Sequence, residues 1–242
     1  MSGNGLMIRN QAVLAILAVL ALHCLNLSTE AGFVLVTSRA GLNQTGQFNL
    51  ANLGPAGTTL PRSYTINSTS NEVAIISQTR SSPQRLNERD PSNGWAGNFL
   101  PGEALIWTVY GGPVNIEFPT TQIKAIGFQI QPDGYGAFTA YISILNSSNT
   151  EIARITRSGS SNSLSDGSAL FIGVAATDSN SFFSKIRFGI QNGGVNLLNF
   201  AYNDISYTDI IVPEPGTVIL AGISAGLLIL VKKRRSRKAI TG

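Results

Sequence analysis

An alternation of apolar and polar side chains at every second position, between residues 32 and 212, most limits how this 242-residue chain can fold. Within 138–144, apolar side chains occupy alternate positions, and the same spacing recurs at 126–130 and 186–190. Successive side chains of a strand point to opposite faces, so the pattern predicts half-buried strands of an antiparallel sheet.

Turn-forming residues separate these predicted strands from one another. Runs of Gly, Pro, Asn, Asp and Ser lie at 111–113, 132–134, 146–149, 158–161 and 192–194. Further strands are predicted at 33–37, 73–79, 105–110, 114–118, 151–156, 169–175 and 205–211. Many short strands, with no helical periodicity between the termini, predict an all-β domain: an antiparallel β-sandwich of the jelly-roll type.

The first 31 residues have the layout of a secretory signal peptide. Arg9 precedes an apolar run from Ala12 to Leu22, and small residues lie near Ala31. This order predicts a signal helix over 1–31, export through the Sec translocon and cleavage by signal peptidase after Ala31. Two alternatives remain open: a lipoprotein signal acylated at Cys24, and a buried helix of a soluble domain.

The last thirty residues, 213–242, combine three different pieces. Pro213, Glu214 and Pro215 interrupt regular structure, and an uncharged run follows from Thr217 to Val231. Six cations then occupy positions 232–238, beginning with Lys232, Lys233, Arg234 and Arg235. An apolar run stopped by cations predicts a transmembrane helix whose far end stays in the cytoplasm. Its 15 residues would span only about 22 Å, which favours a transient membrane stop over a permanent anchor.

Composition excludes several kinds of chemistry from the exported domain. His23 and Cys24 are the only histidine and cysteine of the chain, and both precede Ala31. Disulfides, cysteine nucleophiles, Ser-His-Asp triads and His/Cys zinc sites are therefore not expected. Residues 32–212 hold ten Lys or Arg and eleven Asp or Glu, a net charge of −1, so no nucleic-acid partner is expected either.

Carboxylates are the groups left for catalysis or metal binding. Glu103 and Glu117, near the ends of predicted strands, are candidates for a glycoside-cleaving pair, but no motif supports them, and we expect no catalytic residues. Glu88, Asp90 and Asp133 are weak candidates for calcium in loops, with no recognised calcium-binding spacing. No cofactor is expected.

Exposed aromatic rings beside polar loops would suit a polysaccharide. Trp95 lies in the polar segment 81–98, which we expect to be a long loop, and Tyr135 lies in a turn. Both are candidates for glycan contact, whereas Trp107 falls within a strand pattern and is expected in the core.

The C-terminal order of Pro213-Glu214-Pro215, short apolar run and basic stop resembles the PEP-CTERM sorting signal of Gram-negative and cyanobacterial proteins. The resemblance implies recognition by an exosortase, an integral-membrane cysteine protease that cuts near Pro-Glu-Pro. The body resembles the β-rich domains carried by such proteins, at Trp95–Phe99, Ala125–Gln131, Asp133–Ala140, Phe171–Val174 and Phe200–Tyr207. Related domains often have an acidic pair before the last strand, and this chain has Asn203-Asp204 instead.

Together these features predict a precursor anchored in the inner membrane and a mature protein at the cell surface or in the extracellular matrix. We expect a non-enzymatic structural or adhesive module of a biofilm matrix that contacts exopolysaccharide. The alternative is a carboxylate-dependent glycoside hydrolase or lyase acting on exopolysaccharide.

Overall fold

A computed structural model describes residues 32–79, 87–91, 94–109, 112–178, 181–192, 195–197 and 199–209. The chain divides into two units, Met1–Thr208 and Asp209–Gly242. The predicted signal peptide, Pro-Glu-Pro, apolar run and basic stop all lie outside the described residues. Within the described residues, no helix is long and apolar enough to span a membrane.

The first sheet has nine strands. Seven of them follow one another in the order β1 (Phe33–Val36), β12 (Leu170–Ala176), β9 (Ile123–Pro132), β15 (Phe200–Tyr202), β7 (Ala104–Trp107), β6 (Asn87–Pro91) and β3 (Thr58–Leu60). The sheet forks at β9, because β16 (Ile205–Asp209) also pairs with β9 and carries β2 (Gly46–Phe48) on its other side. Two short 3-10 helices, η1 (Arg39–Leu42) and η2 (Leu50–Leu53), flank β2 in the chain.

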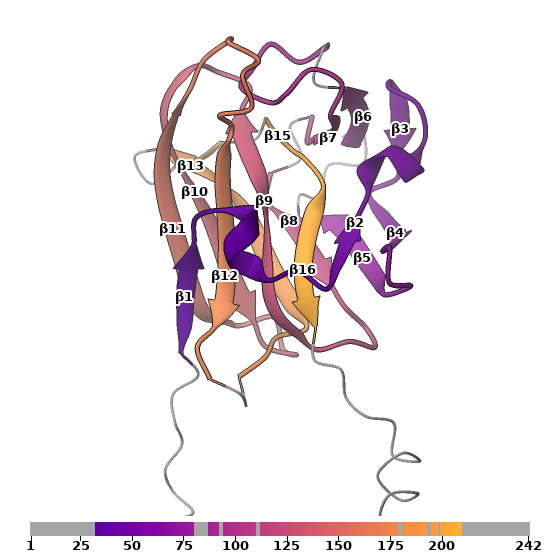
Figure 1. Cartoon of the computed structure of the whole chain (residues 1–242), viewed down its shortest axis with the longest axis vertical. Coiled ribbons are helices and arrows are strands. Elements are labelled where there is room, and N and C mark those ends of the chain that lie inside the picture. Colours follow the sequence, from indigo (N-terminus) through magenta and orange to yellow (C-terminus); the bar gives the residue numbers. More distant parts are fainter. Residues whose placement is uncertain are drawn as a thin grey trace, which may run out of the picture. The chain divides into compact units, whose positions relative to one another are not determined.

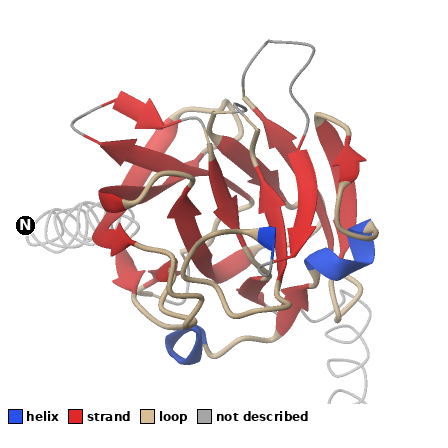
Figure 2. Cartoon of the chain, turned by 90° about the horizontal axis from the view of Figure 1, so that it is seen from above, coloured by secondary structure: helices blue, strands red, loops and turns tan. Residues whose placement is uncertain are grey.

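The second sheet has seven strands. Its order is β11 (Glu151–Ser161), β10 (Gly136–Leu145), β13 (Lys185–Asn192), β8 (Val114–Glu117), β5 (Val73–Gln78) and β4 (Ser63–Asn67), with β14 (Val195–Leu197) pairing β13. The paired strands of both sheets run antiparallel. Figure 1 shows the two layers, and Figure 2 shows them from above on opposite sides of the interior. The predicted all-β fold with antiparallel sheets is confirmed, and the jelly-roll type stays a prediction.

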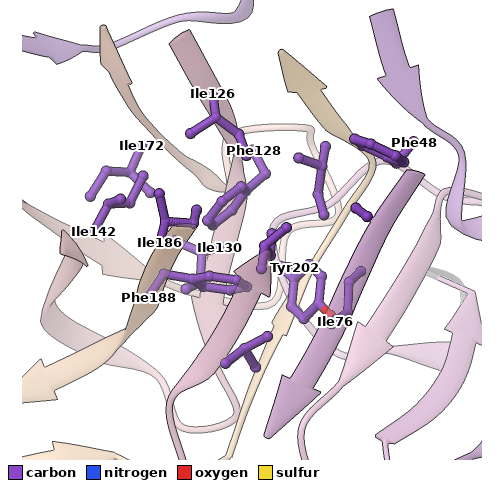
Figure 3. Close-up of a cluster of buried hydrophobic side chains, with 14 of the residues drawn as sticks. Phe48, Ile76, Ile126, Phe128, Ile130, Ile142, Ile172, Ile186, Phe188 and Tyr202 are labelled. Atoms are coloured by element: carbon purple, nitrogen blue, oxygen red, sulfur yellow. The ribbon is translucent and has the colours of Figure 1, made fainter. Parts of the chain in front are cut away.

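The main core lies between the sheets and is built by the predicted alternation. Ile126, Phe128 and Ile130 of β9 are fully buried and face the second sheet. The ring of Phe128 lies 4.4 Å from that of Phe188 on β13, and Tyr202 packs edge-on against Phe188 (Figure 3). Aromatic pairs in such tilted arrangements add to the stabilisation from burial of apolar area.

The outer face of the first sheet is covered at two places. At one, η1 crosses β9 and β12 (Figure 1), and Leu42 packs with Ala125 and Phe171. At the other, the segment 94–103 places Trp95 and Phe99 over Leu105 and Ala201. Polar side chains of the sheet remain between these two small clusters, and this is where the candidate site lies.

Two parts of the strand prediction are wrong. The segment 81–98 is not one long loop, because β6 pairs with β3 on one side and β7 on the other. The run 158–161 is not a turn but the end of β11, which pairs along β10 as far as Ser161. Leu170 lies so close over Gly159 that a Cβ there would be only 3.0 Å from its side chain, and glycine leaves the room that Leu170 needs. In both cases pairing with neighbouring strands of the sheet overrides the local preference of polar and small residues for turns.

Candidate functional site

The site begins at the fork of the first sheet, where Asn203 and Asp204 separate β15 from β16. Asn203 is buried, and its Oδ1 accepts a hydrogen bond of 2.9 Å from the backbone N–H of Gln129. Its Nδ2 donates to Gln129 Oε1 at 2.7 Å and to Glu103 Oε1 at 3.3 Å. One amide therefore satisfies the backbone at the fork and binds two acceptor side chains, which a carboxylate could not do.

Asp204, which precedes β16 at the fork, accepts hydrogen bonds from β2 and η2. Its Oδ1 accepts from the backbone N–H of Leu50 at 2.8 Å, and its Oδ2 accepts from Gln47 Nε2 at 2.9 Å. The two side chains therefore have different roles at the fork: Asn203 donates as well as accepts, and the carboxylate of Asp204 only accepts.

Arg39, the first residue of η1, reaches the same fork from the covering helix. Its guanidinium donates to Ser206 Oγ, to the carbonyl oxygen of Asp204 at 3.1 Å and to Asn203 Oδ1 at 3.4 Å. It also lies 5.9 Å from the centre of the Phe171 ring. Burial lowers the pKa of Arg39, and the carboxylates of Asp204 and Glu103 oppose this effect.

These side chains line a pocket of about 410 Å³, the fork pocket. Its wall carries hydrogen-bonding groups from five parts of the chain: Arg39, Gln47, Asn49, Glu103, Gln129, Asn203 and Asp204, with Ala51, Gly102 and Ala104 between them. Guanidinium, amide and carboxylate groups are planar and offer paired donors or acceptors. Such a wall can bind adjacent hydroxyl groups of a polar ligand.

A second pocket, the basic pocket, adjoins the first because both share Arg39 and Gln129. It measures about 400 Å³ and is lined by Thr37, Ser38, Arg39, Gln129, Arg157, Gly167, Ser168, Ala169, Leu170 and Phe171. Arg157 of β11 donates through Nη1 to the carbonyl oxygens of Thr37, at 2.8 Å, and of Phe171. The two pockets form one polar surface across the outer face of the first sheet.

Trp95 does not form an exposed platform, so that part of the prediction is wrong. Only 7% of its surface is exposed, and its ring packs edge-on against Trp107, with centres 5.9 Å apart. The indole N–H groups of both tryptophans are buried without a hydrogen-bond partner among the described residues. The polar neighbours of Trp95 in sequence suggested exposure, but the segment folds back onto β7 and β15. Trp107 is partly buried and packs against this same cluster.

The segment around Trp95 is held by Asn98, whose side chain is buried. Asn98 Nδ2 donates to Asn162 Oδ1 at 2.7 Å and to Ser168 Oγ at 2.9 Å, and its Oδ1 accepts from the backbone N–H of Asn162 at 2.7 Å. Its backbone N–H donates to Gln131 Oε1 at 2.6 Å. Asn98 therefore joins the covering segment to the loop that borders the basic pocket.

Tyr135 is exposed, as predicted, with 55% of its surface accessible. Its hydroxyl donates to the carbonyl oxygen of Ala96 at 2.7 Å, which holds the ring beside the covering segment. Tyr135 does not line the fork pocket or the basic pocket, so the structure does not bring it together with the polar site.

The two candidate catalytic carboxylates lie in different pockets. Glu103 precedes β7 and lines the fork pocket, where its Oε2 accepts from the backbone N–H of Leu100 at 3.0 Å. Glu117 of β8 forms an ion pair of 2.8 Å with Lys185 and lines another pocket. The structure therefore does not assemble the predicted pair into one site.

The calcium candidates are likewise not grouped in a loop. Glu88 and Asp90 lie on β6, and Asp133 is exposed between β9 and β10. Within the described part of the chain, no three His, Cys, Asp or Glu side chains are placed to hold a metal ion.

Arg39, Gln47 and Gln129 are site residues that the sequence analysis missed. Gln129 was assigned correctly to a strand, where a polar side chain between Phe128 and Ile130 looked like an ordinary solvent-facing position. Arg39 lies more than 160 positions from its partners at the fork, so local pattern could not connect them. The Asn203-Asp204 pair was the one signal in the sequence that marked this place.

Neither a protein-family model nor a curated protein sequence matches the chain. Among solved structures, a DUF4465 family protein from Bacteroides caccae aligns with 74% of this chain and 100% of its own, at 14% identity and a TM-score of 0.37. The carbohydrate-binding module TmCBM27, described for specific mannan recognition, aligns with 73% of this chain and 98% of its own, at 11% identity and a TM-score of 0.27. The α-L-arabinofuranosidase MgGH51 aligns with 76% of this chain and 28% of its own, at 11% identity and a TM-score of 0.27. TM-scores this low carry no argument about what this chain does.

Proposed function

We propose that this chain is an exported, non-enzymatic surface or matrix protein whose sandwich domain binds polysaccharide at the fork pocket. The observation that carries the proposal is the wall of planar hydrogen-bonding groups contributed by Arg39, Glu103, Gln129, Asn203 and Asp204. Sugar rings present adjacent hydroxyls that both donate and accept hydrogen bonds. Paired donors and acceptors that are already held rigidly can bind these hydroxyls with little further loss of side-chain entropy.

Export and sorting rest on the two ends of the sequence. The order of Pro-Glu-Pro at 213–215, a short apolar run and a basic stop supports processing by an exosortase-type membrane protease. The predicted signal peptide at residues 1–31 supports passage through the Sec translocon. The mature protein would then be the domain of net charge −1, outside the cell in contact with exopolysaccharide.

The alternative is a carboxylate-dependent enzyme, and the fork pocket does contain two carboxylates, Glu103 and Asp204. Each of them accepts a backbone N–H bond and a side-chain bond from a neighbouring amide. Carboxylates engaged in this way stabilise the walls of a binding site, because both oxygens of each carboxylate already accept a hydrogen bond from within the protein. These bonds support a binding module.

Affinity electrophoresis of the purified chain through gels containing soluble polysaccharides, neutral and acidic, tests binding. Gln47→Ala removes one group of the pocket wall and should weaken binding about fivefold to tenfold, the value of one hydrogen bond of roughly 1 kcal/mol. Gln122→Ala, an exposed glutamine outside the fork pocket, is the matched control and should bind like the wild type.

The same samples decide between module and enzyme. Retarded migration with no release of reducing ends supports a module. Release of reducing ends that Glu103→Gln abolishes would replace the proposal by the enzyme alternative. If no polysaccharide retards the chain, the proposed function is wrong.

A further inference from the structure

The basic pocket has a composition unlike that of the fork pocket beside it. Its lining contains two guanidinium groups, from Arg39 and Arg157, and no Asp or Glu. The fork pocket, by contrast, sets Glu103 and Asp204 against the single cation Arg39. Positive charge therefore accumulates at one end of a continuous polar surface.

Neutral acceptors hold both of these cations in place. Arg157 bonds to the backbone carbonyl oxygens of Thr37 and Phe171 through Nη1. Arg39 bonds to a serine hydroxyl, an amide oxygen and a backbone carbonyl oxygen. Within the described residues, the ion pairs shorter than 4.0 Å involve other arginines and lysines. Among the described residues, neither cation of the basic pocket therefore forms an ion pair shorter than 4.0 Å, and only Arg39 is partly offset by nearby carboxylates, those of Asp204 and Glu103.

The bonds made by Arg157 also orient it. With Nη1 occupied by two carbonyls that belong to β12 and to the residue after β1, the opposite Nε–Nη2 edge makes no hydrogen bond to the described residues. That edge carries two parallel N–H groups, the arrangement that binds a carboxylate through two bonds. The ring of Phe171, which lies over Gly127 and within reach of Arg39, forms an apolar wall next to it.

We propose that the basic pocket binds the carboxylate of an acidic sugar residue, so that the polysaccharide recognised by this chain contains uronic acid. The proposal rests on the proposed function and specifies its ligand. One sugar lies in the fork pocket, and a neighbouring uronate places its carboxylate at Arg157 and Arg39.

The test compares polygalacturonate with its methyl ester, which has the same rings but no charge, in binding titrations of the purified chain. The acid should bind about tenfold more tightly, as expected for one charge-assisted hydrogen-bonded pair. Arg157→Gln should lower binding of the acid to the level of the ester and leave the ester unchanged. Arg62→Gln is the matched control, since it removes the same charge from an exposed position outside both pockets, and it should change neither.

Several results would overturn the proposal. If acid and ester bind with equal affinity and Gln47→Ala weakens both, the chain binds polysaccharide at the fork pocket but does not recognise uronic acid. An equal loss with Arg62→Gln would show general attraction between charges, and dextran sulfate binding as tightly as polygalacturonate would show a site for any anion. If Arg157→Gln fails to fold, the proposal is tested instead by Arg157→Lys and by the ratio of the wild-type affinities for the acid and for the ester. Failure to bind any polysaccharide would remove both proposals.

Discussion

Replacing Asn98 with alanine should loosen the segment that covers one side of the first sheet. The change removes three short hydrogen bonds, two to Asn162 and one to Ser168. At about 1 kcal/mol net for each bond, the loss is at most about 3 kcal/mol. Asn162 and Ser168 are exposed, so water can replace part of what they lose, and we expect a destabilisation of about 2 kcal/mol.

Urea unfolding measures this loss, and the chain carries its own probe. The only two tryptophans, Trp95 and Trp107, pack against each other in the cluster that Asn98 holds in place. With a slope of about 2 kcal/mol/M, the midpoint of the tryptophan fluorescence transition should fall by about 1 M. Ser158→Ala, which removes one exposed hydrogen bond to Thr139, is the control and should shift the midpoint by no more than about 0.3 M.

The result also separates local from global loosening. If the covering segment detaches alone, tryptophan emission will shift to the red at lower urea than the far-ultraviolet circular dichroism of the sheets. Coincident transitions at a lowered midpoint would mean that the segment unfolds together with the sandwich. A midpoint and an emission maximum that both match the wild type would refute the role assigned to Asn98.

Three further predictions follow from the fork, the core and the C-terminus. Asn203→Asp should destabilise the fold by about 2–3 kcal/mol at neutral pH, because the new carboxylate faces acceptor oxygens of Glu103 and Gln129. Arg39, whose guanidinium donates to the same side chain at 3.4 Å, would offset part of this repulsion; a midpoint of urea unfolding equal to that of the wild type would contradict the prediction. Burial raises the pKa of Tyr202 well above its ordinary value, so the folded protein keeps it neutral while the unfolded chain ionises. Stability should therefore fall as pH rises above about 10, by up to about 1.4 kcal/mol per pH unit for this group, and Tyr202→Phe should flatten that part of a stability–pH curve measured by urea unfolding. Replacing 213–215 with alanines should leave the full-length precursor in the membrane fraction, as judged by mass; an unchanged product outside the cell would count against exosortase sorting.

The polar site illustrates what a sequence of this kind does not reveal. The Asn203-Asp204 pair could be singled out as a departure from an acidic pair, but its role as the branch point of a sheet could not. Gln47, Arg39 and Glu103 join it from positions about 100 to 165 residues away. No local spacing relates such residues, since only the pairing of strands brings them together.

Trp95 shows the same limit from the opposite direction. Its neighbours in sequence are small or polar, which favoured an exposed ring, and yet the ring is buried. Asn98 makes the difference, because it anchors the segment to a loop more than 60 positions away. Polar residues near a tryptophan can therefore form the hydrogen bonds that hold its ring against a sheet, and they do not by themselves indicate an exposed ring.

The sequence by itself determined the class of fold, because alternation along a strand assigns each side chain to a face without reference to any partner. It also determined that residues 32–212 contain no histidine and no cysteine, because composition does not depend on folding. Only the tertiary structure decided where β6 forms, that Trp95 is buried, and that the sheet forks at Asn203-Asp204. Those outcomes depend on which distant strands pair and in what register, and the free energy that selects them comes from contacts between residues far apart in the chain.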